Sequence, residues 1–199
     1  MRDDGAMPRL VPPVVPAGRM RQGDQPLLVA PGGLTLRPWL PSDATSVLAA
    51  YADPEIRHWH RRGVASEDEA REMISTWNHG WAEETTASWA VMADERADVA
   101  GRVAIRDIDL EVGQGEVGYW VLPAARGSGI AVRALQEASR WALEELGLHR
   151  LSLGHSVANT ASCRVADKAG FRLEATLRSA LLHSDGWHDM HLHARIVKE

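Results

Sequence analysis

The chain changes repeatedly between stretches with a strand-like pattern of apolar residues and stretches with a helical repeat. Short runs rich in Val, Leu, Ile, Trp and Tyr between turn residues are typical of β-strands. The predicted strands cover residues 27–29, 34–37, 88–92, 97–108, 116–122, 150–153, 171–176 and 190–197. The three central strands are expected to pair antiparallel through turns at Asp94-Glu95 and Gly113-Gln114-Gly115.

The longest helical repeat runs from Ile130 to Leu146, where apolar residues recur at spacings of four and three and form one stripe. Gly147 is expected to end this helix, because glycine readily adopts the left-handed conformation that closes many helices. Shorter helices are predicted from Ser42-Asp43 to Tyr51, from the capping box Ser66–Glu69 to Trp81, and from the capping residue Asn159 to Gly170. This order, with one strand–loop–helix crossover, predicts a single mixed α/β domain.

Residues 1–25 differ from the remainder of the chain. They contain four prolines and few periodic apolar positions, which predicts a flexible N-terminal arm. The domain is therefore expected to cover residues 26–199, an ordinary size for one unit with its own core.

Composition and charge narrow the functional classes. The formal net charge of −5 argues against a nucleic-acid partner, since such proteins usually carry a basic patch. A single cysteine, Cys163, excludes an internal disulfide and fits a reducing cytoplasm. No apolar run approaches the ~20 residues of a membrane span, and the N-terminus lacks the apolar segment of a signal peptide. The sequence therefore predicts a cytoplasmic protein with neither nucleic acid nor membrane as partner.

The candidate chemistry lies between residues 119 and 131. Tyr119-Trp120-Val121-Leu122 predicts a short strand closed by Pro123, and Arg126-Gly127-Ser128-Gly129-Ile130-Ala131 leads into the long helix. Two glycines let the backbone turn sharply, with no Cβ to keep an anion away. The unpaired N–H groups at the helix start favour a phosphate, and Arg126 is expected to add a charge-assisted contact. The segment predicts a pyrophosphate-binding loop.

Other loops of this general kind are excluded by their spacing. The chain has no Gly-Lys-Ser/Thr ending of a Walker loop and no Gly-x-Ser-x-Gly nucleophile elbow around Ser128. Gly113-Gln114-Gly115-Glu116-Val117-Gly118 matches a dinucleotide fingerprint but precedes a strand, so we interpret it as a hairpin turn.

The remaining pattern, Arg126-x-x-Gly129-x-Ala131, resembles the acyl-CoA pyrophosphate motif of the GNAT N-acyltransferase superfamily. Further motifs occur in the order seen in its Rim-type branch, which is similar to enzymes acting on the N-termini of ribosomal proteins. They are Leu36-Arg37-Pro38-Trp39, Asp53-Pro54-Glu55-Ile56, Gly115-Glu116-Val117-Gly118-Tyr119-Trp120-Val121, and Asn159-x-x-Ser162-x-Arg164-Val165-Ala166-x-Lys168-Ala169-Gly170-Phe171. The resemblance covers roughly residues 33 to 197.

This resemblance implies a GNAT-like fold, a mixed and mostly antiparallel sheet with helices on both faces. It implies acetyl-CoA as co-substrate, no metal, and direct attack by a primary amine in a ternary complex. The acceptor would be a protein or peptide N-terminal amine or a small-molecule amine, and homodimers are common in the family. Acetyl-CoA would contact Tyr119–Leu122, Arg126–Ala131, Asn159 and Ser162, with a backbone N–H of the first segment polarising the thioester carbonyl.

Two residues are candidates for proton transfer. Glu116 stands at the start of the central strand, where family members often carry a carboxylate, and is the predicted base; a solvent-facing or turn-stabilising glutamate is the alternative. Ser162 would protonate the departing thiolate, with a plain helix-surface serine as the alternative. Asn159 fits an N-cap, to which the resemblance adds a hydrogen bond to the pantetheine or its surroundings.

The chain departs from the family pattern at three positions. A tyrosine general acid is absent at about Ala166, and the glutamates of some Rim-type enzymes are absent at Gly154 and at about Leu181. Catalysis would then rest on Glu116, ordered water and His155. These departures leave a second function open, that of an acyl-CoA-binding sensor or interaction module without turnover.

Histidines are frequent near the C-terminus. His183, His188, His191 and His193 cluster in the sequence with Asp185 and Asp189, and the last two histidines would share one strand face. Their spacings do not match structural zinc sites and cysteine partners are missing, so no metal site is predicted. We interpret these residues as polar groups at the rim of the acceptor site.

Overall fold

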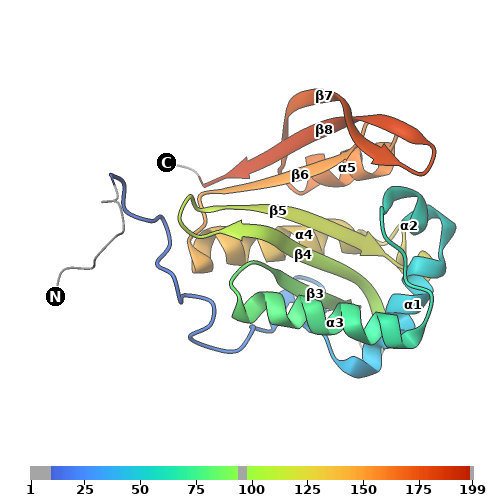
Figure 1. The fold of residues 1–199 in the computed structure, drawn as a ribbon, viewed down its shortest axis with the longest axis horizontal. Helices are drawn as coiled ribbons and strands as arrows, with labels where there is room; N and C mark the ends of the chain where they lie inside the picture. Colours follow the sequence, from blue (N-terminus) through green and yellow to red (C-terminus); the bar gives the residue numbers. More distant parts are fainter. Residues whose placement is uncertain (1–9, 94–97, 198–199) are drawn as a thin grey trace, which may run out of the picture.

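The structure is a computed structural model that describes residues 10–93 and 98–197 (Figure 1). One eight-stranded sheet runs through it in the order β1-β2-β3-β4-β5-β6-β8-β7. Neighbouring strands pair antiparallel except β5 and β6, which are parallel. The predicted mixed, mostly antiparallel sheet is confirmed.

The strands are β1 (Leu28–Ala30), β2 (Leu34–Pro38), β3 (Ala87–Met92), β4 (Val99–Asp109), β5 (Gln114–Val121), β6 (Arg150–Ser156), β7 (Arg172–His183) and β8 (Gly186–Ile196). The α-helices are α1 (Ala44–Ala52), α2 (Pro54–Trp59), α3 (Glu67–Ala82), α4 (Ile130–Arg140) and α5 (Thr160–Lys168). Two 3-10 turns, η1 (Pro41–Asp43) and η2 (Pro123–Ala125), and a π-helical segment, η3 (Trp141–Leu146), complete the described elements.

Helices cover both faces of the sheet, as expected (Figure 1). On one face α4 buries Leu135 and Ala138 against Val103 and Ile105 of β4. On the other face α1–α3 enclose a second apolar cluster around Val47. Among the described residues, no helix is long and apolar enough to span a bilayer.

The long predicted helix is α-helical only to Arg140. Its last turns are π-helical, and the N–H of Gly147 donates to the carbonyl of Ala142 at 3.2 Å. The wider turn lets Trp141 and Leu146 both reach the core. Gly147 has φ +93° and ends the segment as predicted.

Helix α2 was not predicted, because Asp53-Pro54 was interpreted only as the end of the preceding helix. Both residues also fit the start of a new one: Pro54 occupies its first turn, and Asp53 Oδ1 accepts a hydrogen bond from the N–H of Ile56 at 2.9 Å. Asp43 occupies the N-cap position of α1, as predicted, but its side chain makes no cap bond to that helix. Its carboxylate accepts from Arg37 and from the N–H of Leu40 instead of from a helix amide.

The hairpins are set by their turns. Gly113 has φ +73° between β4 and β5, which agrees with the hairpin interpretation of the Gly-x-Gly-x-x-Gly segment. The predicted turn at Asp94-Glu95 lies outside the described residues. The predicted strand 171–176 extends to His183 as β7, because β8 pairs with it again beyond an irregularity between Leu177 and Leu181.

The N-terminal segment packs on the domain over residues 14–25, where a flexible arm was expected. Val15 and Met20 are buried in the main core. The N–H groups of Gly18 and Met20 donate to the Glu84 carboxylate at 2.6 and 2.7 Å. Burial acts to raise the pKa of Glu84, but these backbone amides hold it below its ordinary value. The buried apolar residues of this segment follow no helical or strand-like repeat, so their burial could not be predicted from the sequence pattern.

Met20→Ala should therefore destabilise the fold by about 2–5 kcal/mol, because it removes a fully packed side chain and leaves a cavity. Urea unfolding with a fixed m-value measures the change. Leu10→Ala is the control, since Leu10 is 97% exposed and should change stability by no more than about 0.5 kcal/mol. Equal midpoints for both variants would mean that the segment is detached in solution.

Candidate functional site

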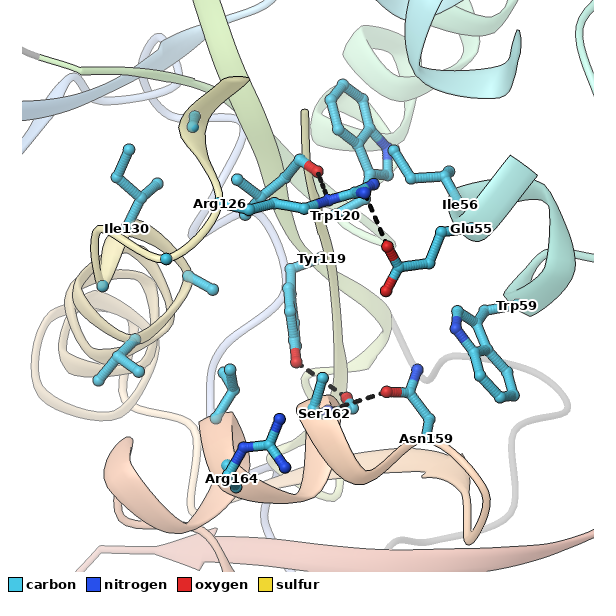
Figure 2. Close-up of a pocket in the computed structure, with 18 of the residues that line it drawn as sticks. Glu55, Ile56, Trp59, Tyr119, Trp120, Arg126, Ile130, Asn159, Ser162 and Arg164 are labelled. Atoms are coloured by element: carbon cyan, nitrogen blue, oxygen red, sulfur yellow. Dashed lines mark hydrogen bonds and ion pairs between the residues drawn. The ribbon is translucent and has the colours of Figure 1, made fainter. Parts of the chain in front are cut away.

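A pocket of about 390 Å³ opens between the end of β5, the start of α4, helix α2 and helix α5 (Figure 2). It exists because β5 and β6 separate. Their parallel ladder joins only Gln114–Glu116 to Arg150–Ser152, although β5 continues to Val121 and β6 to Ser156. Beyond Glu116 the two strands diverge, so backbone groups of β5 border the opening without a β6 partner.

Most of the residues predicted to bind acetyl-CoA are brought together around this pocket. Those that line it are Tyr119, Trp120, Val121, Arg126, Gly127, Gly129, Ile130, Ala131, Asn159 and Ser162. Two others do not: Leu122 packs on the second core, and Ser128 Oγ donates to the carbonyl of Ala125 at 2.7 Å. The contacts of these residues with a cofactor stay a prediction.

The loop before α4 has the shape of an anion cradle. Gly127 and Gly129 have φ +78° and +76°, a conformation that favours glycine, and a Cβ added at either would meet open space. Gly129 is the N-cap of α4, and no side chain caps the helix. The first amides of α4 are thus free to donate to a ligand at the positive end of the helix dipole.

Arg126 is engaged differently from the prediction. Its guanidinium donates to Glu55 at 2.7 Å, and its Nε donates to the carbonyl of Val121 (Figure 2). The guanidinium also donates to Asp53 at 2.7 Å. The hydrogen bond from Arg126 holds the pKa of Asp53 below its ordinary value. Glu55 lies on α2 and Asp53 is its N-cap, so Arg126 joins α2 to the loop and its charge is compensated by two carboxylates. Its contact with a phosphate stays a prediction.

Two cations that the sequence reasoning did not assign to the site line the pocket from α5. They are Arg164 and Lys168, spaced i and i+4 and therefore on one face of the helix. That spacing was a usable signal. Trp59 at the end of α2 and His60, its C-cap, add to the wall, and neither was assigned to the acetyl-CoA site from the sequence.

Tyr119 and Ser162 face each other across the pocket, with their hydroxyl oxygens 2.8 Å apart (Figure 2). Burial raises the pKa of Tyr119, although the hydrogen bond to Ser162 lowers it, so the phenol holds its proton at neutral pH. Asn159 Oδ1 accepts from the N–H of Ser162 at 2.9 Å, which confirms the predicted N-cap. The phenol missing at the buried Ala166 is thus present in the pocket, supplied by β5 instead of α5.

Glu116 lies at the last paired position of the β5–β6 ladder, where the strands begin to diverge. It is three residues from Tyr119, so the two side chains leave β5 on opposite faces, and Glu116 is not among the residues that line the pocket. Its carboxylate is half-buried and pairs with Arg106. Burial raises the pKa of Glu116, and the charge of Arg106 opposes this rise. A Cβ at Gly154 would lie 3.8 Å from the Glu116 carboxylate, so the glycine borders this carboxylate.

The predicted histidine cluster is divided between two places. His188 Nδ1 bonds to Ser156 Oγ at 2.7 Å and its Nε2 to Asp185 at 2.9 Å, and Trp59 of the pocket wall lies beside His183 and His188. Side chains alternate between the two faces along β8, and His191 is three residues from His188, so His191 and His193 lie on the face opposite to His188. His155 lies with this second pair and not in the pocket, so the predicted route through His155 has no support in the geometry.

Gly129→Val should weaken CoA binding by about 10²-fold or more, because a branched side chain would fill the cradle and remove charge-assisted bonds worth about 1.5–3 kcal/mol each. Calorimetric titration with CoA measures the affinity. Gly170→Val is the matched control: Gly170 has φ +84° with open space around its Cβ and does not line the pocket. It should show similar backbone strain but wild-type affinity, and equal affinity of both variants would refute the placement of the pyrophosphate.

Comparisons with known proteins agree with this arrangement. The family model described as "Acetyltransferase (GNAT) domain" matches residues 33–172. "Uncharacterized N-acetyltransferase p20" of Bacillus licheniformis is 27% identical over 146 residues, which cover 73% of this chain and 82% of that protein. "Ribosomal-protein-serine acetyltransferase" of Escherichia coli (strain K12) is 35% identical over 82 residues, or 41% of this chain and 46% of that protein.

Solved structures share the fold. RimL, described as a ribosomal L7/L12 alpha-N-protein acetyltransferase in complex with coenzyme A, superposes with a TM-score of 0.80 and 20% identity over 86% of this chain and 98% of that one. Mycobacterium smegmatis RimJ in complex with CoA-disulfide gives a TM-score of 0.77 and 23% identity, with 86% of each chain covered.

Proposed function

Because the chain belongs to the GNAT acetyltransferase family, we propose that it transfers the acetyl group of acetyl-CoA to the α-amine of a protein, with ribosomal proteins as the substrate class. Two similar proteins support this choice of acceptor, since RimL and the Escherichia coli relative are named for ribosomal proteins. A small-molecule amine is the second acceptor class.

The proposed donor site follows the pocket. The pyrophosphate would accept hydrogen bonds from the amides at the start of α4, and Arg164 and Lys168 on α5 would supply positive charge. The pantetheine arm would then run into the opening between β5 and β6, where the backbone groups on this edge of β5 lack a β6 partner. A β5 amide there would donate to the thioester oxygen as negative charge develops on it.

Proton transfer is assigned to the two sides of β5. The amine nitrogen attacks the thioester carbon, the C–S bond breaks, and the proton lost by the amine passes to Glu116 directly or through water. The sulfur leaves as a thiolate and takes a proton from Ser162, which takes one in turn from the Tyr119 phenol bonded to it. The phenolate regains its proton from solvent after the products leave, and Glu116 releases the proton that it accepted. The single observation that carries the proposal is this hydroxyl pair, placed in the same pocket as the α4 cradle.

An α-amine fits this machinery better than a lysine side chain. Its ordinary pKa of about 7.7–8.0 leaves a useful neutral fraction at pH 7, whereas an alkylammonium at about 10.4 does not. The raised pKa of Glu116 lies closer to neutral pH than that of an ordinary glutamate, so this carboxylate is better matched to an α-amine.

The acceptor class is tested with matched peptides. The protein is incubated with acetyl-CoA and a peptide carrying a free serine or alanine N-terminus and one internal lysine, or the same peptide with its N-terminus blocked. We expect CoA thiol release and a single acetyl group on the N-terminal residue by fragment mass spectrometry, with the blocked peptide inert. Acetylation of a diamine or of lysine alone would instead assign the second acceptor class.

A further inference from the structure

A second group of side chains lies on the side of α5 that faces the sheet. His155 of β6, Cys163 of α5, and His191 and His193 of β8 each point one potential metal ligand into the same space, and these four atoms lie within 4.8 Å of one another. None of the four lines the acetyl-CoA pocket. The group is therefore separate from the site described above, although both share α5.

The strand register brings these residues together. In the β6–β8 ladder His155 is opposite His191 and Leu153 is opposite His193, so the three histidines occupy one face of the sheet. Helix α5 covers that face. Its residues Ala161, Ser162 and Val165 line the acetyl-CoA pocket, whereas Cys163 does not. The sequence alone places 155, 163 and the pair 191/193 far apart.

The hydrogen bonds of the two buried histidines fix their tautomers. His155 Nδ1 lies 2.8 Å from the carbonyl of Ser156, and His193 Nδ1 lies 3.3 Å from the carbonyl of Phe171. A carbonyl only accepts, so each Nδ1 carries the proton and each Nε2 presents a lone pair. These two Nε2 atoms are 3.1 Å apart. Two acceptors at this distance need a cation between them.

His191 adds a further unsatisfied group, because its Nδ1 is buried without a hydrogen-bond partner in the described chain. A shared proton would be a poor substitute for a metal. It would place an imidazolium charge inside the buried group, where an uncompensated charge is costly. The four described residues of the group include no carboxylate that could compensate such a charge.

We propose that His155, Cys163, His191 and His193 bind one zinc ion. Three imidazole nitrogens and one thiolate form a ligand set typical of tetrahedral zinc, and the Nδ1 bonds to backbone carbonyls are the outer-shell contacts that orient zinc-bound histidines. A tetrahedral site with Zn–N bonds of about 2.0–2.1 Å separates its nitrogens by about 3.4 Å, close to the distance between His155 and His193. Four protein ligands leave no open position, so the ion is structural. It joins α5 to β6 and β8, directly beside Ser162.

The full-length protein is tested with metals alone. Purified protein is stripped with a chelator, then titrated with Co²⁺ and Zn²⁺. We expect one equivalent of Co²⁺ to give the intense visible bands of a tetrahedral complex and a thiolate-to-metal charge-transfer band. Zn²⁺ should displace the Co²⁺ stoichiometrically and raise the melting temperature. These measurements involve neither acetyl-CoA nor an amine, so their outcome is independent of the proposed acetyl transfer.

Variants locate the ion. Cys163→Ser should abolish the charge-transfer band and weaken Zn²⁺ binding by about 10²-fold or more, and His191→Ala should remove the tetrahedral spectrum. His183→Gln is the control, since His183 is a buried histidine of the β7–β8 hairpin outside the group, and it should keep wild-type spectra and stoichiometry. Less than half an equivalent of tightly bound metal, octahedral Co²⁺ spectra, or an unchanged charge-transfer band in Cys163→Ser would each overturn the proposal.

Discussion

Ser162→Ala should lower kcat by about 10²–10³-fold while the affinity for acetyl-CoA stays within a few-fold of wild type. The hydroxyl contacts Tyr119 and not the polypeptide around it, so its removal leaves the N-cap bond from Asn159 to the backbone in place. What is lost is the proton that the departing thiolate needs. Single-turnover kinetics with a peptide acceptor, together with calorimetric titration of CoA, separate the two effects.

Tyr119→Phe tests whether the Tyr119 and Ser162 hydroxyls act together in proton transfer to the sulfur. The phenol reaches the sulfur only through Ser162 in the proposed arrangement, so its loss should cost about tenfold in kcat, and it should cost nothing further when Ser162 is already alanine. Ser139→Ala is the control, since its buried hydroxyl lies on α4 outside the pocket. Additive losses in the double variant would mean that the two hydroxyls act independently, and a fully active Ser162→Ala would return Ser162 to the helix-surface interpretation.

Glu116→Gln is expected to reduce turnover by about 10²-fold or more with little change in CoA affinity. The loss should be larger for a lysine-like amine than for an α-amine, because the former requires more help with deprotonation at neutral pH. Raising the pH should partly restore the variant, since more free amine is then present. Glu174→Gln is the matched control, because Glu174 is also an ion-paired glutamate on a strand of the sheet but lies on β7, which does not border the opening between β5 and β6.

The pH dependence of kcat/KM tests Glu116 through the direction of its pKa shift. A base is active when it is deprotonated, and burial raises the pKa of Glu116, so the acid limb of kcat/KM should fall at a higher pH than an ordinary glutamate would give. Arg106→Gln removes the charge that opposes this rise and should move the limb to still higher pH. A Glu116→Gln enzyme with wild-type turnover across the pH range would make Glu116 structural.

Much of the site could be predicted from the sequence because it is local. The cradle Arg126–Ala131 is one contiguous strand–loop–helix segment, and its glycines have the positive φ values that such a loop requires. The N-cap at Asn159 and the hairpin at Gly113 are equally local, since each depends on residues within a few positions. The order of these segments also carried the resemblance to the GNAT family.

Contacts between distant segments could not be predicted in this way. The sequence suggested that Arg126 binds phosphate, and only the position of α2 shows its charge compensated by Asp53 and Glu55. It indicated a missing tyrosine on α5, and only the approach of β5 to α5 places the Tyr119 phenol against Ser162. Residues 14–25 have no repeat that would announce the burial of Val15 and Met20.

The sequence by itself indicated the reaction class and predicted which loop would bind the cofactor, because turns, caps and strand–helix alternation are properties of neighbouring residues. The tertiary structure decided which distant side chains meet. Strand register assigned His191 and His193 to His155 and separated them from His188, since a shift of one residue moves a side chain to the other face of the sheet. The early divergence of β5 from β6 opened the pocket beyond Glu116, and no pattern along either strand records where their pairing ends.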